Sequence, residues 1–396
     1  MTCWRDHRSR LYVSMQKNIL WLPVLAALCL GWADRAVGVD HVTLRRDGAV
    51  IHASGRLLVT AQDGGLLVES RDGVLWGITP EELVEHASDD VPFEPFSAEE
   101  MSRRLLAELP AGFEVHQTAH YTICHNTSRR YAQWCGSLFE RLYRAFHNYW
   151  TNRGFKLSEP EFPLTAIVFS DQASFVKFSR AELGDAAGSL IGYFSLRTNR
   201  MTTYDLTGVE QYRRLLPGGN QGVPIETILA QPEALRQVAT IVHEATHQIA
   251  FNCGLHRRYS DCPSWFSEGI AVFFETPDLN SATGWRSIGT INQPRLVQFR
   301  KYLENRPADS LRTLIADDRR FRNTESGLDA YAEAWSLTYY LIRRYPRQYV
   351  AYLKSLSEKR PLLYDDPETR VREFEAAFGD LETLDAEFVR YVQRLR

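Results

Sequence analysis

Residues 238–275 read VATIVHEATHQIAFNCGLHRRYSDCPSWFSEGIAVFFE, and this stretch decides the fold. Its first part carries an HExxH motif, with His243 and His247 on a helix predicted from about Pro232 to Cys253. Histidines four residues apart project from the same helix face, so both imidazoles can reach one metal ion. In such a site Glu244 faces the metal-bound water without binding the metal. The motif therefore predicts a metal centre on a helix.

A third metal ligand is available on the next predicted helix. Twenty residues separate the second histidine from Glu268; Pro263 suits the start of this helix and Pro277 its end. Zinc hydrolases use three protein ligands and keep one coordination position open for water. His243, His247 and Glu268 therefore predict one catalytic Zn²⁺ ion.

The two motifs together resemble a known family. HExxH followed by W-x-x-E-G-x-A, here Trp265 to Ala271, is similar to the gluzincin metallopeptidases. These include aminopeptidase-N-like enzymes and the peptidase MA-like domains found in secreted bacterial proteins. The similarity is direct over residues 238–275 and looser over 113–396. It implies a gluzincin-like zincin core, the three zinc ligands named above, and Glu244 as the general base for peptide hydrolysis.

The resemblance also implies roles for two more residues. Glu275, seven residues after Glu268, matches the family's second acidic position and would hold a metal ligand in place; a structural carboxylate is the alternative. Tyr331 lies 63 residues after Glu268, near the family's transition-state tyrosine, and is the candidate for stabilising the oxyanion. A core tyrosine packed with Trp335 and Tyr339 is the alternative.

One departure from the family narrows the expected activity. The GxMEN signature that binds a free substrate N-terminus is absent before His243, so the resemblance implies an endopeptidase or a peptidase of narrow specificity. The segment 191–206, IGYFSLRTNRMTTYDL, reads as one or two strands. It could supply an edge strand for an extended peptide substrate, or form an ordinary internal hairpin.

The secondary-structure pattern of the whole chain predicts an α+β protein. Short β-type runs separated by Asp-Gly turns predict a small hairpin region, and a helical pattern follows residue 288. The predicted divisions are a signal peptide at 1–38, a β-hairpin region at 39–80, a linker and helix at 81–112, a catalytic α+β domain at 113–287 and a helical C-terminal subdomain at 288–396. The region before residue 113 is either a propeptide or an accessory domain.

Five segments before the metal motif have clear local signals. The polar stretch His86–Pro95 is the candidate linker, and a capping-box pattern starts a helix at Ser97. Phe113–Cys124 reads as one strand, Ser128–Trp150 as a long amphipathic helix, and Leu164–Ser170 as a buried strand.

The composition excludes some classes of protein. The 396 residues carry 46 Lys+Arg against 49 Asp+Glu, a formal charge of −3, and 44% are hydrophobic. That apolar fraction can fill a packed core, so wholesale disorder is excluded. A near-neutral chain also lacks the basic surface that a nucleic-acid partner requires.

The N-terminus has the pattern of a secretory signal. Basic residues precede the apolar run Ile19–Leu30, and small residues suit cleavage after Ala33 or Gly38. The run is shorter than the roughly 20 apolar residues of a spanning helix, so no stable membrane insertion is expected after cleavage. An uncleaved anchor is the alternative. We therefore expect an exported protein that is periplasmic, extracellular or at the cell surface.

Export changes the interpretation of the cysteines. Two of the six are lost with the signal, which leaves Cys124, Cys135, Cys253 and Cys262. In an oxidising compartment the pairs Cys124–Cys135 and Cys253–Cys262 are favoured, because each closes a short loop. Four buried free thiols are the alternative.

Together these patterns predict an exported zinc metallopeptidase that acts on a peptide or protein substrate. A secreted binding or assembly protein with a gluzincin-like zinc site and no peptidase activity is the alternative. Hydrolysis of a non-peptide amide or ester at the same site is a third reading. The intact Glu244 favours an enzyme, because structural zinc sites usually close all four positions with protein ligands. The pattern sets neither the substrate nor the oligomeric state.

Overall fold

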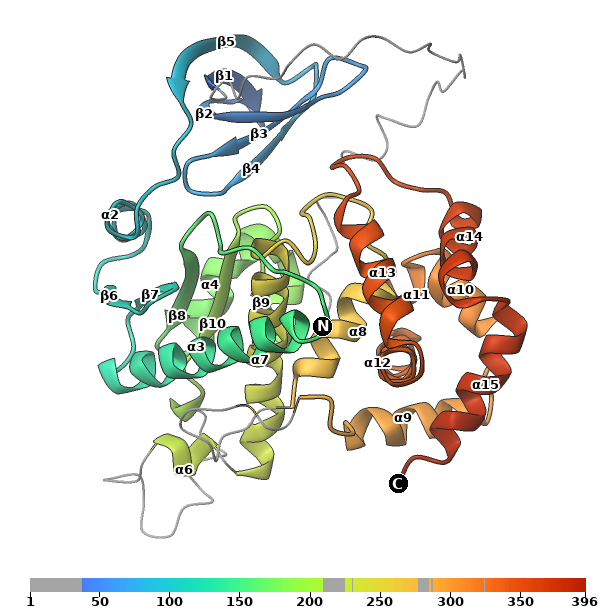
Figure 1. Cartoon of the computed structure of the whole chain (residues 1–396). Helices are drawn as coiled ribbons and strands as arrows, with labels where there is room; N and C mark the ends of the chain where they lie inside the picture. The colour runs from blue at the N-terminus through green and yellow to red at the C-terminus, as the bar shows by residue number, and fades with distance from the viewer. Residues whose placement is uncertain (1–37, 209–224, 230, 277–284, 286–287, 324) are drawn as a thin grey trace.

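The computed structural model describes residues 38–208, 225–229, 231–276, 285, 288–323 and 325–396 (Figure 1). Its secondary structure is mixed α+β, with a sheet at the N-terminus and a helical region at the C-terminus, which confirms the predicted class at that level. Nearly all of the predicted signal peptide lies outside the described residues. Within the described part, no helix is both long and apolar enough to cross a membrane.

An antiparallel sheet of five strands forms the N-terminal part of the structure. Its strands are β1 (Gly38–Arg46), β2 (Ala49–Thr60), β3 (Leu66–Ser70), β4 (Leu75–Ile78) and β5 (Leu83–Pro92), in the order β4-β3-β2-β1-β5. Asp47 and Gly48 have φ of 51° and 80°, as the tight turn between β1 and β2 requires. One face of the sheet buries a small apolar cluster around Val42, Leu44 and Val68.

The expected linker at His86–Pro95 is wrong for most of its length. Strand β5 continues to Pro92 and pairs antiparallel with β1. It is the last strand of the sheet, and most of its side chains are exposed. An edge strand can carry polar and charged side chains because its backbone bonds to one neighbour are enough to hold it. The polar composition therefore concealed a strand.

A second sheet of five strands carries the central part of the chain. Its strands are β6 (Glu114–Gln117), β7 (Tyr121–His125), β8 (Leu164–Phe169), β9 (Gly192–Phe194) and β10 (Arg200–Tyr204), in the order β6-β7-β8-β10-β9. Strands β7, β8 and β10 are parallel, whereas β9 runs antiparallel to β10. The segment 191–206 is therefore a hairpin, and its first strand lies at the edge of the sheet.

The single strand expected at Phe113–Cys124 is a hairpin of β6 and β7. The chain reverses between them, where the N–H of Thr118 donates to the carbonyl of Tyr121 at 2.9 Å. Oε1 of Glu140, on a helix that follows, accepts hydrogen bonds from the Thr118 hydroxyl (2.7 Å) and the His120 N–H (2.8 Å). The turn is thus stabilised by a side chain distant in sequence, which local patterning could not reveal.

Six α-helices and two short 3-10 helices belong to the first two-thirds of the described chain. They are α2 (Ala98–Glu108), α3 (Arg129–Thr151), α4 (Gln172–Leu183), η1 (Gly184–Ser189), η2 (Leu206–Gly208), α6 (Ile225–Leu229), α7 (Pro232–Asn252) and α8 (Ser264–Phe274). The predicted capping box is present, because Ser97 and Glu100 cap each other's backbone at the start of α2. Ser128 caps α3, and α3 and α7 pack against the second sheet (Figure 1).

The C-terminal part is helical, as expected. Its helices are α9 (Gln293–Leu303), α10 (Ser310–Ala316), α11 (Arg319–Arg322), α12 (Gly327–Arg344), α13 (Pro346–Ser357), α14 (Pro367–Phe378) and α15 (Leu381–Gln393). Helix α12 is largely buried and packs on both α8 and α9. One hydrophobic core runs from Met101 on α2 to Val392 on α15, so these helices share the core of the central α+β part.

A buried arginine connects the N-terminal sheet to the turn between β9 and β10. Arg258, buried in the loop after α7, donates to Oε1 of Glu69 at 2.6 Å. It also donates to the carbonyls of Gly73 (2.7 Å) and Leu196 (3.2 Å). One guanidinium therefore joins the N-terminal sheet to the segment that carries the edge strand β9.

The predicted disulfides are wrong, and the alternative of buried free thiols is confirmed. This holds for Cys124, Cys135, Cys253 and Cys262, all of which are described. Burial raises the pKa of the Cys253 thiol to about 12, and its Sγ lies 3.3 Å from Nε2 of His147. All four thiols lie in the large hydrophobic core, where they pack among apolar side chains. Short loop length was therefore a misleading signal.

Candidate metal centre

Helix α7 places the two predicted histidine ligands on one face. Its opposite face packs into the core through apolar side chains at helical spacing, namely Val238, Val242, Ala245 and Ile249. The amide of Gln248 donates to the carbonyls of Thr165 (2.9 Å) and Asn199 (3.2 Å). These bonds tie α7 to β8 and to the turn between β9 and β10.

Helix α8 is buried along its whole length and brings Glu268 to the histidines. The N–H of its first residue, Ser264, donates to Oδ1 of Asp318 at 2.8 Å. Gly269, next to the glutamate, faces α12, and a Cβ at this position would collide with Oγ1 of Thr338. The glycine of the E-G-x-A motif therefore allows α8 and α12 to pack closely behind the ligand.

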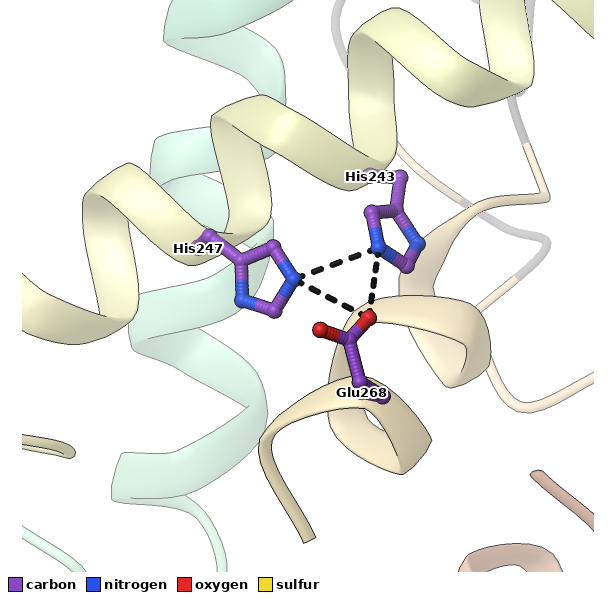
Figure 2. A group of neighbouring side chains, drawn as sticks. All are labelled: His243, His247 and Glu268. Atoms are coloured by element: carbon purple, nitrogen blue, oxygen red, sulfur yellow. Dashed lines mark hydrogen bonds and ion pairs between the residues drawn. The ribbon is translucent and has the colours of Figure 1, made fainter. Parts of the chain in front are cut away.

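The three predicted ligands converge (Figure 2). The Nε2 atoms of His243 and His247 lie 3.2 Å apart, and Oε2 of Glu268 lies 3.0 Å from the first and 3.4 Å from the second. A tetrahedral ion with ligand bonds of about 2.0–2.1 Å holds its ligand atoms about 3.3 Å apart, so the three atoms fit one face of such a site. In the part of the chain that the structure describes, this is the one group of three or more side chains able to hold a metal ion.

Opposite charges hold the group together. Burial would lower the pKa of His243, but hydrogen bonds to Glu268 and Glu275 outweigh it and raise the pKa to about 10. Burial would raise the pKa of Glu268, but the two histidines lower it well below its usual range. The side chains of His243, His247 and Glu268 are 7%, 4% and 2% exposed. The group therefore favours a positive charge between its ligand atoms, which a proton or a metal cation can supply.

Glu275 lies where the resemblance implied. Its Oε2 is 3.1 Å from Nδ1 of His243, so Nδ1–H can donate to the carboxylate while Nε2 stays directed at the other ligands. Its Oε1 accepts from Nδ2 of Asn292 (2.9 Å) and from Nε of Arg295 (3.2 Å). Neither residue was identified from the sequence. Asn292 before Gln-Pro is a helix-start signal, which locates α9 but does not show what α9 contacts.

Glu244 lies beside the ligand group and is not part of it. Its Oε2 accepts a hydrogen bond from the backbone N–H of Phe194, the last residue of β9, at 2.9 Å. Burial raises the pKa of the Glu244 carboxyl, against the opposing charges of His243 and His247. A carboxylate with a raised pKa accepts a proton more readily, which suits a general base.

Tyr331 reaches the same site from α12. Its ring centroid lies 6.4 Å from that of His243 and 5.3 Å from that of Phe321. Burial, followed by the charges of Glu268 and Glu244, raises the pKa of the Tyr331 hydroxyl well above its ordinary value. The structure therefore brings Tyr331 to the predicted ligands, as well as burying it.

One family match covers this site. Residues 237–363 match a family described as a protein of unknown function, DUF1570. The matched stretch contains the histidine pair, Glu268, Glu275 and Tyr331. No curated protein matches the chain. The family description assigns no chemistry, so the function has to be argued from the geometry of the site.

Another buried histidine lies close to the predicted ligands and was not singled out from the sequence. His256 is 3% exposed, and its ring centroid lies 5.2 Å from that of Phe251 and 5.7 Å from that of Phe266. Burial, helped by the charge of His247, lowers the pKa of His256 to about 3. No motif spacing identifies such a residue, because its burial depends on the loop between α7 and α8.

We expect His256→Phe to weaken the pH dependence of stability in the chelator-treated protein. In the fold His256 stays neutral down to about pH 3, whereas the unfolded chain takes up its proton near pH 6.5. Below pH 6.5 the unfolded state therefore binds more protons, and acidification destabilises the native protein by up to about 1.4 kcal/mol per pH unit. Urea unfolding at pH 7.0, 6.0 and 5.0 measures this slope. Equal slopes in the two proteins would contradict the assignment, whatever the absolute stability of the variant.

Proposed function

We propose that the chain is an exported zinc metallopeptidase with a gluzincin-like core. The proposal rests chiefly on one observation, the buried group of His243, His247 and Glu268 with a separate carboxylate, Glu244, beside it. Two imidazoles and one carboxylate, at these spacings, suit Zn²⁺ with one coordination position left for water. Export, to the periplasm, cell surface or medium, is supported by the signal-like sequence at residues 1–38.

The residues around the group support hydrolysis of a carbonyl compound. A zinc ion held there would lower the pKa of water and polarise a carbonyl group. Glu244 takes the proton of the attacking water and passes it to the leaving amine, while the Phe194 N–H keeps its carboxylate in place. The hydroxyl of Tyr331 stabilises the negative charge that develops on the substrate oxygen.

Strand β9 supports a peptide as the substrate. It is the last strand of its sheet, so its outer edge can pair with an extended chain. Its final residue already contacts Glu244. A peptide paired along β9 would therefore pass next to the general base. This arrangement favours peptide bonds over the other amides or esters that such a site could hydrolyse.

A purely structural zinc site is the competing function. Structural sites usually use four protein ligands, whereas the group formed by the described residues has three. A secreted binding or assembly role would also give no function to Glu244 or to the Phe194 N–H that holds it.

Peptide-library profiling of the purified protein tests the proposal. We expect about one zinc per chain, because the three side chains surround a single ion position. We also expect cleavage of internal peptide bonds, because the sequence lacks the GxMEN signature that binds a free substrate N-terminus. Activity should stop with a chelator and return with added zinc. Cleavage that persists after verified zinc removal would contradict the mechanism. A zinc-loaded protein that cleaves no library peptide would favour the binding role.

A further inference from the structure

We propose that Arg295 is a positioning residue that couples the outer carboxylate of the metal site to Tyr331. Its guanidinium lies between Glu275, the partner of His243, and the ring of Tyr331. The inference rests on the metal site of the proposed function and does not depend on peptide hydrolysis.

The first arm of this coupling runs through Glu275. Arg295 Nε lies 3.2 Å from Oε1 of Glu275, and Asn292 donates to the same oxygen at 2.9 Å. The opposite oxygen of Glu275 faces Nδ1 of His243 at 3.1 Å. Arg295 and Asn292 both belong to the start of α9, and the Asn292 side chain caps this helix by accepting the N–H of Arg295. The helix start therefore presents two donors to one carboxylate oxygen.

Glu275 depends on these donors because it is only 8% exposed. A buried carboxylate is stable as an anion when a cation or several hydrogen-bond donors lie beside it. As an anion it accepts Nδ1–H of His243, and this fixes the tautomer that leaves the Nε2 lone pair for a metal ion held with Glu268 and His247. Loss of Arg295 would therefore loosen a metal ligand that it does not touch.

The second arm runs to Tyr331. The guanidinium carbon of Arg295 lies 5.6 Å from the centroid of the Tyr331 ring, within the range of a cation–π contact. The centroid of the same ring lies 6.4 Å from that of the His243 ring. Arg295 is itself 9% exposed, so solvent does little to screen either contact. One side chain thus contacts both the carboxylate that orients a ligand and the tyrosine proposed to stabilise the oxyanion.

The chain offers a matched control in Arg320. Its Nη2 donates to Oε2 of Glu333 at 2.7 Å, and its guanidinium carbon lies 5.6 Å from the centroid of the Tyr302 ring. This arginine also bridges a buried glutamate and a tyrosine, but its side-chain hydrogen bonds go to Ser310, Tyr302 and Glu333 and not to the metal ligands. Arg320→Met therefore measures what the loss of such a bridge does to the fold alone.

Zinc affinity of the full chain is the deciding measurement, made by competition with a chromogenic chelator well below the melting temperature of each variant. We expect Arg295→Met to weaken zinc binding by about 10- to 100-fold, the usual effect of removing a partner of a metal-bound histidine. Arg320→Met should stay within about twofold of the wild type. Arg295→Lys should recover part of the loss, because it restores the charge beside Glu275 without the planar fork.

Double variants separate the two arms. If Arg295 acts through Glu275, the double variant Glu275→Gln/Arg295→Met binds zinc no more weakly than Glu275→Gln alone. If it also fixes Tyr331, the fall in melting temperature of metal-free Arg295→Met/Tyr331→Leu is smaller than the sum of the two single falls. Additive losses in the first pair, or equal affinities of Arg295→Met and Arg320→Met, would overturn the inference. If Arg295→Met does not fold, Arg295→Lys takes its place, both in the comparison with Arg320→Met and in the double variant with Glu275→Gln. A zinc affinity of Arg295→Lys equal to that of the wild type would then overturn the inference.

The outcome is independent of the substrate. Zinc affinities that follow the expected order in a protein without peptidase activity would leave this inference standing and remove only the proposed reaction. If the protein is an active peptidase and Arg295→Met binds zinc as tightly as the wild type, this inference is overturned and the proposed reaction stands.

Discussion

Glu244→Gln is expected to keep its zinc and to lose about 10²- to 10⁴-fold of its hydrolysis rate, the usual contribution of a general base. The amide can still accept the Phe194 N–H that now binds Oε2, so the side chain keeps its place. It cannot take a proton from water. Zinc content by elemental analysis and kcat on the best library peptide measure the two effects separately.

Glu182→Gln is the matched control for this change. Glu182 accepts hydrogen bonds from the hydroxyls of Ser195 and Tyr193, next to the same edge strand, but lies outside the ligand group. We expect its kcat to stay within a few fold of the wild type, since the amide oxygen can accept from one hydroxyl while the amide nitrogen donates to the other. Full activity in the Glu244 variant would exclude that carboxylate as the base. An equal loss in both variants would assign the effect to the position of β9.

Glu268→Gln is expected to weaken zinc binding by at least about 100-fold, more than the loss of a residue that merely supports a ligand. The substitution keeps the shape of a side chain that is 2% exposed, but removes the anionic oxygen lying 3.0 Å and 3.4 Å from the two histidine nitrogens. The two imidazoles on α7 would remain as a weaker, neutral pair. Competition with a chelator gives the affinity directly.

Thermal unfolding with added zinc gives a second measurement for Glu268→Gln. Zinc at 100 times its Kd should stabilise the wild type by about 2.7 kcal/mol, because the ion binds the folded chain. The variant should lose most of this increase at the same zinc concentration. Glu275→Gln should lie between the two proteins, because it affects His243 without removing a ligand. Undiminished zinc stabilisation of the Glu268 variant would rule out that residue as the third ligand.

Several elements could be predicted because their signals are local. The capping box at Ser97, the amphipathic helix from Ser128 and the HExxH helix each depend on residues within one or two turns of one another. The positions of the two histidines follow directly from helix geometry. Glu268 was also identified, since Pro263 and the W-x-x-E-G-x-A pattern locate the helix that carries it.

The errors concern segments whose structure depends on distant partners. The linker expected at His86–Pro95 is mostly a strand because β1 supplies its hydrogen bonds. The strand expected at Phe113–Cys124 is a hairpin because Glu140 satisfies the donors of its turn. The cysteines are free because the core, and not loop length, decides their neighbours. In each case the deciding group lies far along the chain.

By itself the amino-acid sequence determined which side chains could bind a metal, because helix periodicity and the 20-residue spacing from His247 to Glu268 are properties of the chain. Only the tertiary structure decided that these side chains meet, that β9 brings an N–H to Glu244, and that Arg295 lies between Glu275 and Tyr331. The physical reason is that the place of each ligand on its own helix needs only local order. The meeting of the ligands, and the surroundings that orient them, depend on packing α7, α8, α9 and α12 into one core.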